Sequence, residues 1–439
     1  MGRILGECVR QVLICLLCFS VWPSAVTGQE QAAGIEFEEA PIRKAGDILP
    51  EEMVSGPTFR VLDNVGSFDS LNLFTVESEF GEIEIYGEPM LRIRLREMKA
   101  LETLRATTTA KAAGQAAGRT ATKSFKSLGA AIAHPVRTAK GVPKGVSRLF
   151  KSVGRDVNEV VDDTQKLQQD SSVAEATASK YGKKLVGIDK AERRWAKKVG
   201  VDPYSTNEAL GAELRRVAEV DAAASIGTKL IAPSLPELAK VLADVSETVY
   251  DHDWRELFDL NWAALAEMGA TPEQSQQFFD NEPLTPSLDT LIVSSLEEMD
   301  GVADRPLVIE QAALLESESE AVFFAESVML ASWFHTDQTP LERMVFATLI
   351  PVGMTADGRL IAFTAADDAY WTRTAATAAV EFHETYQDMS EQREVWIAGH
   401  TSTRFRQAVE GLGWTVRDSL REELLPLVPW GVGGSLADE

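Results

Sequence analysis

Cysteine is almost absent from this sequence, and its three copies, Cys8, Cys15 and Cys18, all lie within the first 18 residues. Those residues have the pattern of a secretory signal peptide, so we expect the mature chain to contain no cysteine. This absence excludes disulfides, thiolate nucleophiles, cysteine-ligated zinc and iron–sulfur clusters from the mature protein. It gives little positive information about activity.

Long apolar runs are also missing. Arg3 and Arg10 flank a short apolar core, Val12–Trp22, and small residues follow at Ser24–Gly28, which predicts cleavage after Gly28. The apolar core has 11 residues, whereas a membrane-spanning helix needs roughly 20. We therefore predict an exported protein, periplasmic or secreted; an uncleaved anchor and a buried core helix are the alternatives. The longest later apolar run, Val322–Phe334, is interrupted by Glu326.

The familiar catalytic and cofactor motifs are missing as well. The sequence has no phosphate-binding loop, no dinucleotide fingerprint, no H-E-x-x-H and no G-x-S-x-G. Its five histidines include no pair at i and i+4. The acids of Asp251–Asp253 are explained by a helix start, and those of Glu381–Glu384 by a solvated helix face. We expect no metal and no cofactor.

Positive charge is scarce in the second half of the chain, where no lysine follows Lys240. The formal net charge is -24, which argues against nucleic-acid binding over most of the surface. Residues 99–151 contain 11 basic residues and one acid, whereas residues 202–439 contain 14 basic residues and 42 acids. The basic stretch either neutralises the acidic body or faces an anionic surface.

Part of this basic stretch has the pattern of an amphipathic helix. An apolar stripe with helical spacing is formed by Val142, Val146, Leu149, Val153, Val157 and Val160. Such a helix can lie on an anionic membrane; its alternative is to pack its valine face on its own domain. The partner is thus an anionic membrane surface or an envelope protein. The candidate docking residues are Lys123, Lys126, Arg137, Lys140, Lys144, Arg148 and Lys151.

Composition and periodicity predict a mainly helical α+β protein, with a small N-terminal β-rich block, a central helical region and a C-terminal compact α/β unit. The predicted parts are a signal peptide (1–28), a flexible acidic leader (29–50), a β-rich block with a helix (51–105), a basic helical or linker region (106–198), a helical domain (199–340), an α/β unit (341–420) and a tail (421–439).

Within these parts the pattern predicts individual elements. In the first half we expect strands at 59–62, 73–76 and 83–86, a helix at 90–104, and a helix through Ala224 with a capping box of Ser205 and Glu208. The central helices are predicted at 236–249, 253–268, 272–279, 286–299 and 306–334. The C-terminal unit is predicted as strands 344–351 and 360–364 around Asp357-Gly358, helix 371–386, strand 395–398, helix 403–410 and strand 414–416, with one βαβ crossover.

The best candidate for a small site is the turn between the strand at 395–398 and the helix at 403–410. Open backbone N–H groups there favour an anion, and the candidate residues are His400, Thr401, Ser402 and Arg404. The alternative is that Thr401 or Ser402 caps the helix. A hydrolytic triad of Ser402, His400 and Asp367 is also conceivable, although only geometry can establish a triad.

Four blocks resemble a group of secreted bacterial proteins of unknown function. They are Val76–Gly81, Pro135–Val146 with its Gly-Val-Pro-Lys-Gly-Val, Gly200–Asn207, and the strand–helix–Gly-Trp block Val395–Val416. The blocks are spread over most of the expected mature chain. The resemblance implies an exported protein of shared architecture and implies no particular activity, cofactor or catalytic residue.

These observations predict an exported cell-envelope protein that acts by binding or organisation rather than by catalysis. The alternative is a hydrolase or another small-ligand enzyme with its site in the C-terminal α/β unit. A cleft in which His400 and Ser402 converge with an acid would favour the enzyme. The sequence alone predicts neither the ligand nor the oligomeric state.

Overall fold

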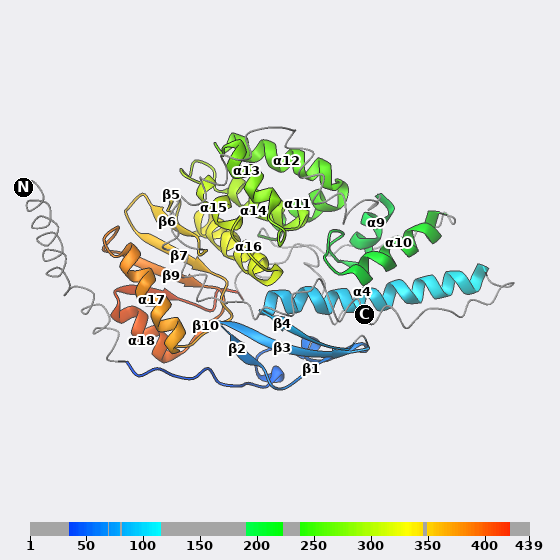
Figure 1. Ribbon diagram of the computed structural model, residues 1–439, viewed down its shortest axis with the longest axis horizontal. Helices are drawn as coiled ribbons and strands as arrows, with labels where there is room; N and C mark the ends of the chain where they lie inside the picture. The colour runs from blue at the N-terminus through cyan, green and yellow to red at the C-terminus, as the bar shows by residue number, and fades with distance from the viewer. Residues whose placement is uncertain are drawn as a thin grey trace, which may run out of the picture.

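The structure is a computed structural model that describes residues 35–68, 70–79, 81–115, 190–222, 238–345 and 349–421. Over these residues the fold is mainly helical α+β, as predicted, with a small N-terminal sheet, a central group of helices and a C-terminal sheet with crossover helices (Figure 1). The predicted signal peptide and the basic docking residues from Lys123 to Lys151 lie outside the described residues.

The N-terminal sheet is antiparallel, with β3 paired to β1, β2 and β4. Strand β3 is the longest strand of this sheet. Its alternating residues Phe74 and Val76 are buried and pair with Ile85 and Ile83 on β4. The strands predicted at 59–62, 73–76 and 83–86 are confirmed, and β2 is an addition. The elements of this block are η1 (Ala45–Asp47), α3 (Glu51–Val54), β1 (Phe59–Val61), β2 (Gly66–Phe68), β3 (Leu71–Ser78) and β4 (Gly81–Tyr86).

Helix α4 (Glu88–Gln115) begins directly after β4 and is longer than the predicted 90–104. Its apolar positions Leu91, Leu95, Leu101 and Leu104 are buried. The helix contacts the N-terminal sheet, α16 (Glu318–Trp333), and the pair α9 (Lys190–Val199) and α10 (Glu208–Ala222). It therefore connects three parts of the molecule.

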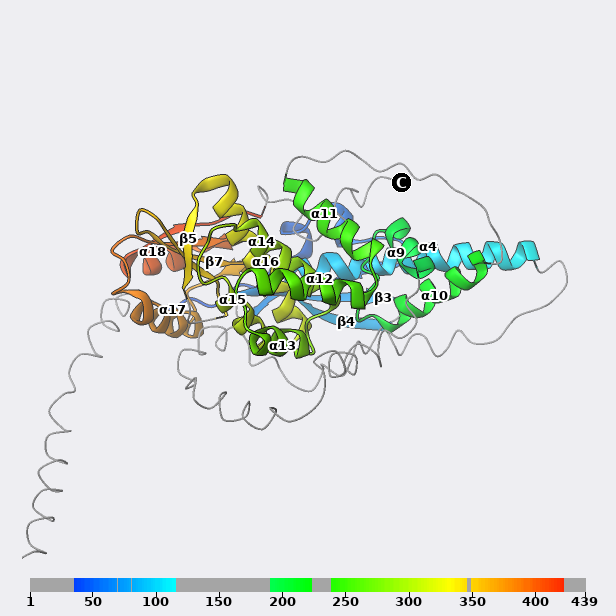
Figure 2. The same ribbon diagram turned by 90° about the horizontal axis from the view of Figure 1, so that it is seen from above.

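The central helices gather above α4 and the N-terminal sheet (Figure 1 and Figure 2). They are α11 (Leu238–Asp251), α12 (Trp254–Glu267), α13 (Pro272–Asp280), α14 (Pro286–Glu298), α15 (Pro306–Ala312) and α16 (Glu318–Trp333), which continues into the π-helix η2 (Phe334–Gln338). The prediction of a single helix at 306–334 is wrong, because the chain breaks after Ala312 and Ser317 caps a new helix by accepting the N–H of Glu320.

Another cap also differs from the prediction. The capping box of Ser205 and Glu208 is wrong, because the side chain of Asn207 accepts the N–H groups of Ala209 and Leu210 at 3.1 and 3.2 Å. The hydroxyl of Ser205 instead donates to Glu97 of α4. The segment before α10 thus joins α10 to α4.

The C-terminal sheet has the order β11-β9-β7-β6-β5. Strands β5 to β7 form an antiparallel meander, and β7, β9 and β11 are parallel. The predicted strand 344–351 is wrong in its bounds, because β6 rather than that segment pairs with β7 across the Asp357-Gly358 turn. The strands are β5 (Leu341–Val345), β6 (Val352–Thr355), β7 (Leu360–Thr364), β9 (Arg393–Ile397) and β11 (Trp414–Arg417).

Two crossovers complete this unit. Helix α17 (Arg373–Tyr386) connects β7 to β9, and α18 (Thr403–Gly411) connects β9 to β11. The short strands β8 (Asp368–Ala369) and β10 (His400–Thr401) pair at the carboxyl end of the sheet. Alternate residues of β7 face opposite sides: Phe363 packs on Phe334 after α16, whereas Ala362 faces α17 and α18. Both faces of β7 are therefore covered.

Residues 35–50, predicted as part of a flexible leader, run along the molecule from the C-terminal unit to the N-terminal sheet (Figure 1). The N–H of Glu38 donates to the carbonyl of Trp371 at 2.9 Å, and Arg43 forms a bridge with Val65. The composition of residues 29–50 predicts a flexible leader, but the described part of this segment forms backbone hydrogen bonds with two distant parts of the chain.

Gly399 generates a stability prediction, because a Cβ at this position would lie 1.9 Å from the carbonyl oxygen of Asp367. We expect Gly399→Ala to lower the free energy of unfolding by about 3 kcal/mol or more, since the backbone cannot give way cheaply. Gly411→Ala is the control, because its Cβ meets nothing within 4 Å, and it should change stability by less than about 1 kcal/mol. Equal denaturation midpoints for the two variants would contradict this packing.

Candidate functional site

The turn predicted to bind an anion lies at the carboxyl end of β9 and contains the start of α18. Ser402 is the N-cap of α18, and its oxygen accepts the N–H of Phe405 at 3.0 Å. Its hydroxyl donates to the carboxylate of Glu38. The capping alternative is therefore confirmed for Ser402, and a carboxylate of the same chain lies where an anion was expected.

The other turn residues contact groups of the chain as well. The N–H and hydroxyl of Thr401 both donate to Asp418, which also pairs with Arg406 at 2.7 Å. The pKa of Asp418 is lowered, because hydrogen bonds from Thr401 and Arg406 outweigh its burial. Arg404 donates to the carbonyl of Phe37 at 3.3 Å. The turn thus holds internal carboxylates, Glu38 and Asp418.

The conceivable triad is not assembled. The Nδ1 atom of His400 lies 2.8 Å from the hydroxyl of Ser419, while Ser402 bonds to Glu38. The carboxylate of Asp367 is buried and bonds to other groups. The residues brought together are therefore His400 and Ser419, and Ser419 has a positive φ of 63°.

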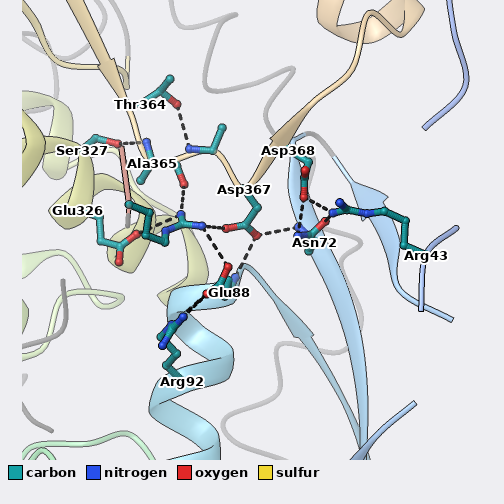
Figure 3. A network of polar contacts seen from close by, with 12 residues as sticks. Arg43, Asn72, Glu88, Arg92, Glu326, Ser327, Thr364, Ala365, Asp367 and Asp368 are labelled. Carbon is teal, nitrogen blue, oxygen red and sulfur yellow. Dashed lines mark hydrogen bonds and ion pairs between the residues drawn. The ribbon is translucent and has the colours of Figure 1, made fainter. Parts of the chain in front are cut away.

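Asp367 is the centre of a buried polar network (Figure 3). One of its carboxylate oxygens accepts the backbone N–H groups of Asn72 and Glu88, each at 2.9 Å, and the other accepts from Arg421 at 2.8 Å. Its own N–H donates to the carbonyl of Ser70 at 2.9 Å. A single side chain therefore ties the starts of β3 and α4 to the end of the C-terminal sheet.

Arg421 contacts two further carboxylates. It lies 3.4 Å from Glu88 and 3.7 Å from Glu326 of α16, and it donates to the carbonyl of Ala365 at 2.9 Å. Glu88 is also paired with Arg92. Figure 3 shows Glu88 of α4, Glu326 of α16 and Asp367 of the segment after β7 converging. We call Glu88, Glu326, Asp367 and Arg421 the carboxylate–arginine cluster.

The carboxyl groups of this cluster have different proton affinities. Burial raises the pKa of Glu326 to about 8, although Arg421 opposes the change. Burial raises the pKa of Asp367 to about 6, again against Arg421. Burial also acts to raise the pKa of Glu88, but Arg421 and Arg92 reverse that effect and lower it. Near neutral pH Glu326 is therefore protonated and neutral. The two arginines, Arg421 and Arg92, then balance the two ionised carboxylates of Asp367 and Glu88.

A second pair extends this network toward the leader. Arg43 forms an ion pair with Asp368, and the side-chain amide of Asn72 donates to Asp368 at 2.8 Å. The leader, β3 and the segment after β7 therefore meet at adjacent acids. These contacts join the leader to β3 and to the segment after β7, and the Asp368 carboxylate is bonded within the chain.

The cavity beside this network is the candidate binding site. It has a volume of about 700 Å³ and lies between the C-terminal sheet and the crossover helices α17 and α18, with the leader and the β2–β3 turn at one end. Its lining is mainly apolar or small, and it includes Phe323, Ile350, Ala362, Ala375, Ala378, Ala379, Phe382, Val395, Ile397, Phe405, Val409, Leu412 and Trp414. None of the four residues proposed from the sequence lines it.

The sequence contained one signal for the cluster and none for the cavity. Glu326 interrupts an apolar run, and it is 3% exposed in the structure. Burying a charged carboxylate costs free energy, which is why the pKa of Glu326 is raised. The sequence predicts Arg421 as the first residue of the tail, but its side chain bonds to Asp367 and Ala365 of the α/β unit. A cavity depends on how one face of a strand packs against a helix. The spacing of residues in the sequence does not show that packing.

The described residues contain no group of three metal-ligating side chains. No helix among them has both the length and the hydropathy needed to cross a bilayer. Asp253 caps α12 in a capping box with Glu256, as the helix-start interpretation predicted.

No protein-family model matches the chain, and comparisons with curated proteins and with solved structures give no match either. The resemblance to secreted bacterial proteins stays a prediction. The functional argument therefore depends on the site itself.

Glu326 generates a pH-dependent prediction. Because its folded pKa is about 8 and lies above its usual value of 4.5, the folded state binds more protons, and the contribution of Glu326 to stability is lost as pH rises toward 8. Glutamine cannot titrate. Between pH 6 and 8 the wild type should therefore lose unfolding free energy relative to Glu326→Gln, by about 1.4 kcal/mol per pH unit. Parallel stability curves from chemical denaturation would refute the assignment.

Proposed function

We propose that the chain is an exported binding protein of the cell envelope that holds a small, mainly apolar molecule in the cavity of its C-terminal α/β unit. The observation that carries the proposal is the cavity of about 700 Å³ between the sheet and helices α17 and α18. Ligand cavities typically have volumes of roughly 300–1,000 Å³ and mostly apolar walls with a few polar groups. This cavity meets both criteria.

The space has a clear origin in the sequence. Helix α17 presents Ala375, Ala378 and Ala379 to the sheet, and the sheet presents Ala362 of β7 to the helix. Small side chains on both facing surfaces leave a gap that larger residues would fill. Protein interiors normally have few voids larger than a water molecule, so a gap of this size supports a ligand rather than a packing defect.

Binding is favoured over catalysis by the placement of the polar groups. His400 and Ser402 do not line the cavity, and Ser402 is engaged with Glu38. The buried acids of the carboxylate–arginine cluster are paired with arginines. The cavity is lined by apolar groups, hydroxyl groups, the leader acids Glu38 and Glu39, and Arg373, and this lining contains no histidine or cysteine. Such a lining suits the binding of a molecule better than nucleophilic catalysis.

Export and an envelope partner are part of the proposal and derive from the sequence. The N-terminal pattern of Arg3, Arg10 and Val12–Trp22 supports export. The basic segment at 123–160 supports a contact with an anionic membrane surface or an envelope protein. A protein that binds apolar molecules next to a membrane would be close to a source of them.

The cavity is tested by filling it. The apolar fluorescent probe N-phenyl-1-naphthylamine should bind the wild-type protein with enhanced fluorescence, and Ala379→Trp should weaken its binding at least tenfold, because the new side chain occupies the space. Thr377→Trp is the matched control, since Thr377 is exposed on the same helix and does not line the cavity. Circular dichroism verifies that both variants fold.

Two results would count against the proposal. A folded wild-type protein that gives no probe fluorescence would show that the cavity takes no apolar molecule. Equal weakening by Ala379→Trp and Thr377→Trp would show that the probe binds elsewhere on the helix.

A further inference from the structure

We infer that the cavity binds an anionic single-chain amphiphile, with the hydrocarbon chain inside and a carboxylate head next to Arg373. This inference rests on the proposed function and specifies its ligand class. Its basis is the distribution of residue types along the cavity, together with the one cation in the lining.

The strands place polar and apolar residues at different depths. Thr364 ends β7 and lines the cavity beyond Ala362, while Ser70 and Tyr370 line it close to the carboxyl ends of the strands. Toward the amino ends the lining is apolar, as at Val395 of β9. Since residues two apart on a strand share one face, Ala362 and Thr364 lead along β7 toward its carboxyl end, where Ser70 and Tyr370 also line the cavity.

Helix α17 shows the same order, because the crossover returns against the direction of the strands, whereas the residues of α18 that line the cavity are all apolar. Helix α17 contributes Thr374 and Ala375 at its start and Phe382 near its end. Helix α18 contributes Phe405 at its start and Leu412 just beyond its end, next to Trp414. From Thr374 to Phe382 the helix rises by about 12 Å. The cavity is therefore elongated, with a polar end and an apolar end.

Arg373 is at the polar end and carries the positive charge available there. Of the cavity-lining residues, all in the described part of the chain, it alone is basic. Its guanidinium lies 4.8 Å from the ring centre of Phe37, and no ion pair joins it to a carboxylate of the described residues. Arginine binds carboxylates with paired hydrogen bonds, so a carboxylate head satisfies this group.

The acids at the same end do not provide that partner. Glu38 accepts the N–H of Trp371 at 2.6 Å and the hydroxyl of Ser402, so its carboxylate is already hydrogen-bonded. Glu39 is exposed on the leader. The charge of Glu39 would favour a ligand with a cationic head, whereas Arg373 would favour a ligand with an anionic head. Arg373 has no carboxylate partner among the described residues and lies against the ring of Phe37, which favours the anionic head.

The inference is tested by displacing the bound fluorescent probe at pH 8 with three ligands of equal chain length: decanoate, decan-1-ol and decyltrimethylammonium, each below its micellar concentration. Decanoate should displace the probe at about tenfold lower concentration than the cationic ligand. Arg373→Gln should remove most of that preference and leave displacement by decan-1-ol unchanged. Arg417→Gln is the control, because Arg417 is exposed at the end of β11 and does not line the cavity.

The outcomes separate the two levels of the argument. Equal displacement by all three ligands, tighter binding of the cation, or a preference that persists in Arg373→Gln would overturn the head-group assignment and leave the apolar cavity in place. Failure of the probe and of all three ligands to bind would overturn the proposed function itself. A preference that falls equally in Arg417→Gln would assign the effect to overall charge rather than to Arg373.

Discussion

A buried carboxylate, Asp367, is the constraint on which the architecture depends. It is 2% exposed, accepts two backbone N–H groups from the N-terminal block, and pairs with Arg421 after the last strand. An uncompensated charge in such a place would be costly, so the β3 and α4 starts and the end of the α/β unit must be assembled together. The neighbours Ala366 and Ala369 line the cavity. The carboxylate–arginine cluster thereby positions the polar end of the cavity, where its hydroxyl groups lie.

Much of the fold could be predicted because its signals are local. The alternating residues of β3 and β4 and the periodic apolar residues of α4 are each read within one element, as are the prolines at the starts of α13 and α14. Failures occurred where a tertiary contact decided the outcome. Ser205 has the spacing of a cap, but Glu97 takes its hydroxyl and Asn207 caps α10 instead. The break before α16 has no glycine or proline to announce it.

The site could be predicted only in part, for a related reason. The turn at 400–404 was correctly located at a strand end and a helix start, but its expected anion is supplied by Glu38, more than 350 residues away in sequence. Arg421 and Glu88 are likewise brought together only by the fold. The cavity arises from alanines on facing surfaces, and alanine is common in helices of every kind. Nothing in the spacing of Ala375, Ala378 and Ala379 distinguishes a cavity wall from a close helix–sheet contact.

Asp367 and Arg421 act as a unit that joins the N-terminal block to the α/β unit. A double-mutant cycle with Asp367→Asn and Arg421→Met, measured as unfolding free energy at pH 8, tests it most directly. Arg421→Met alone should cost about 3 kcal/mol, because it leaves buried carboxylates without their cation. The pair should show a coupling of at least about 1 kcal/mol. Additive effects, with a coupling near zero, would contradict the claim that these two residues hold the two parts together.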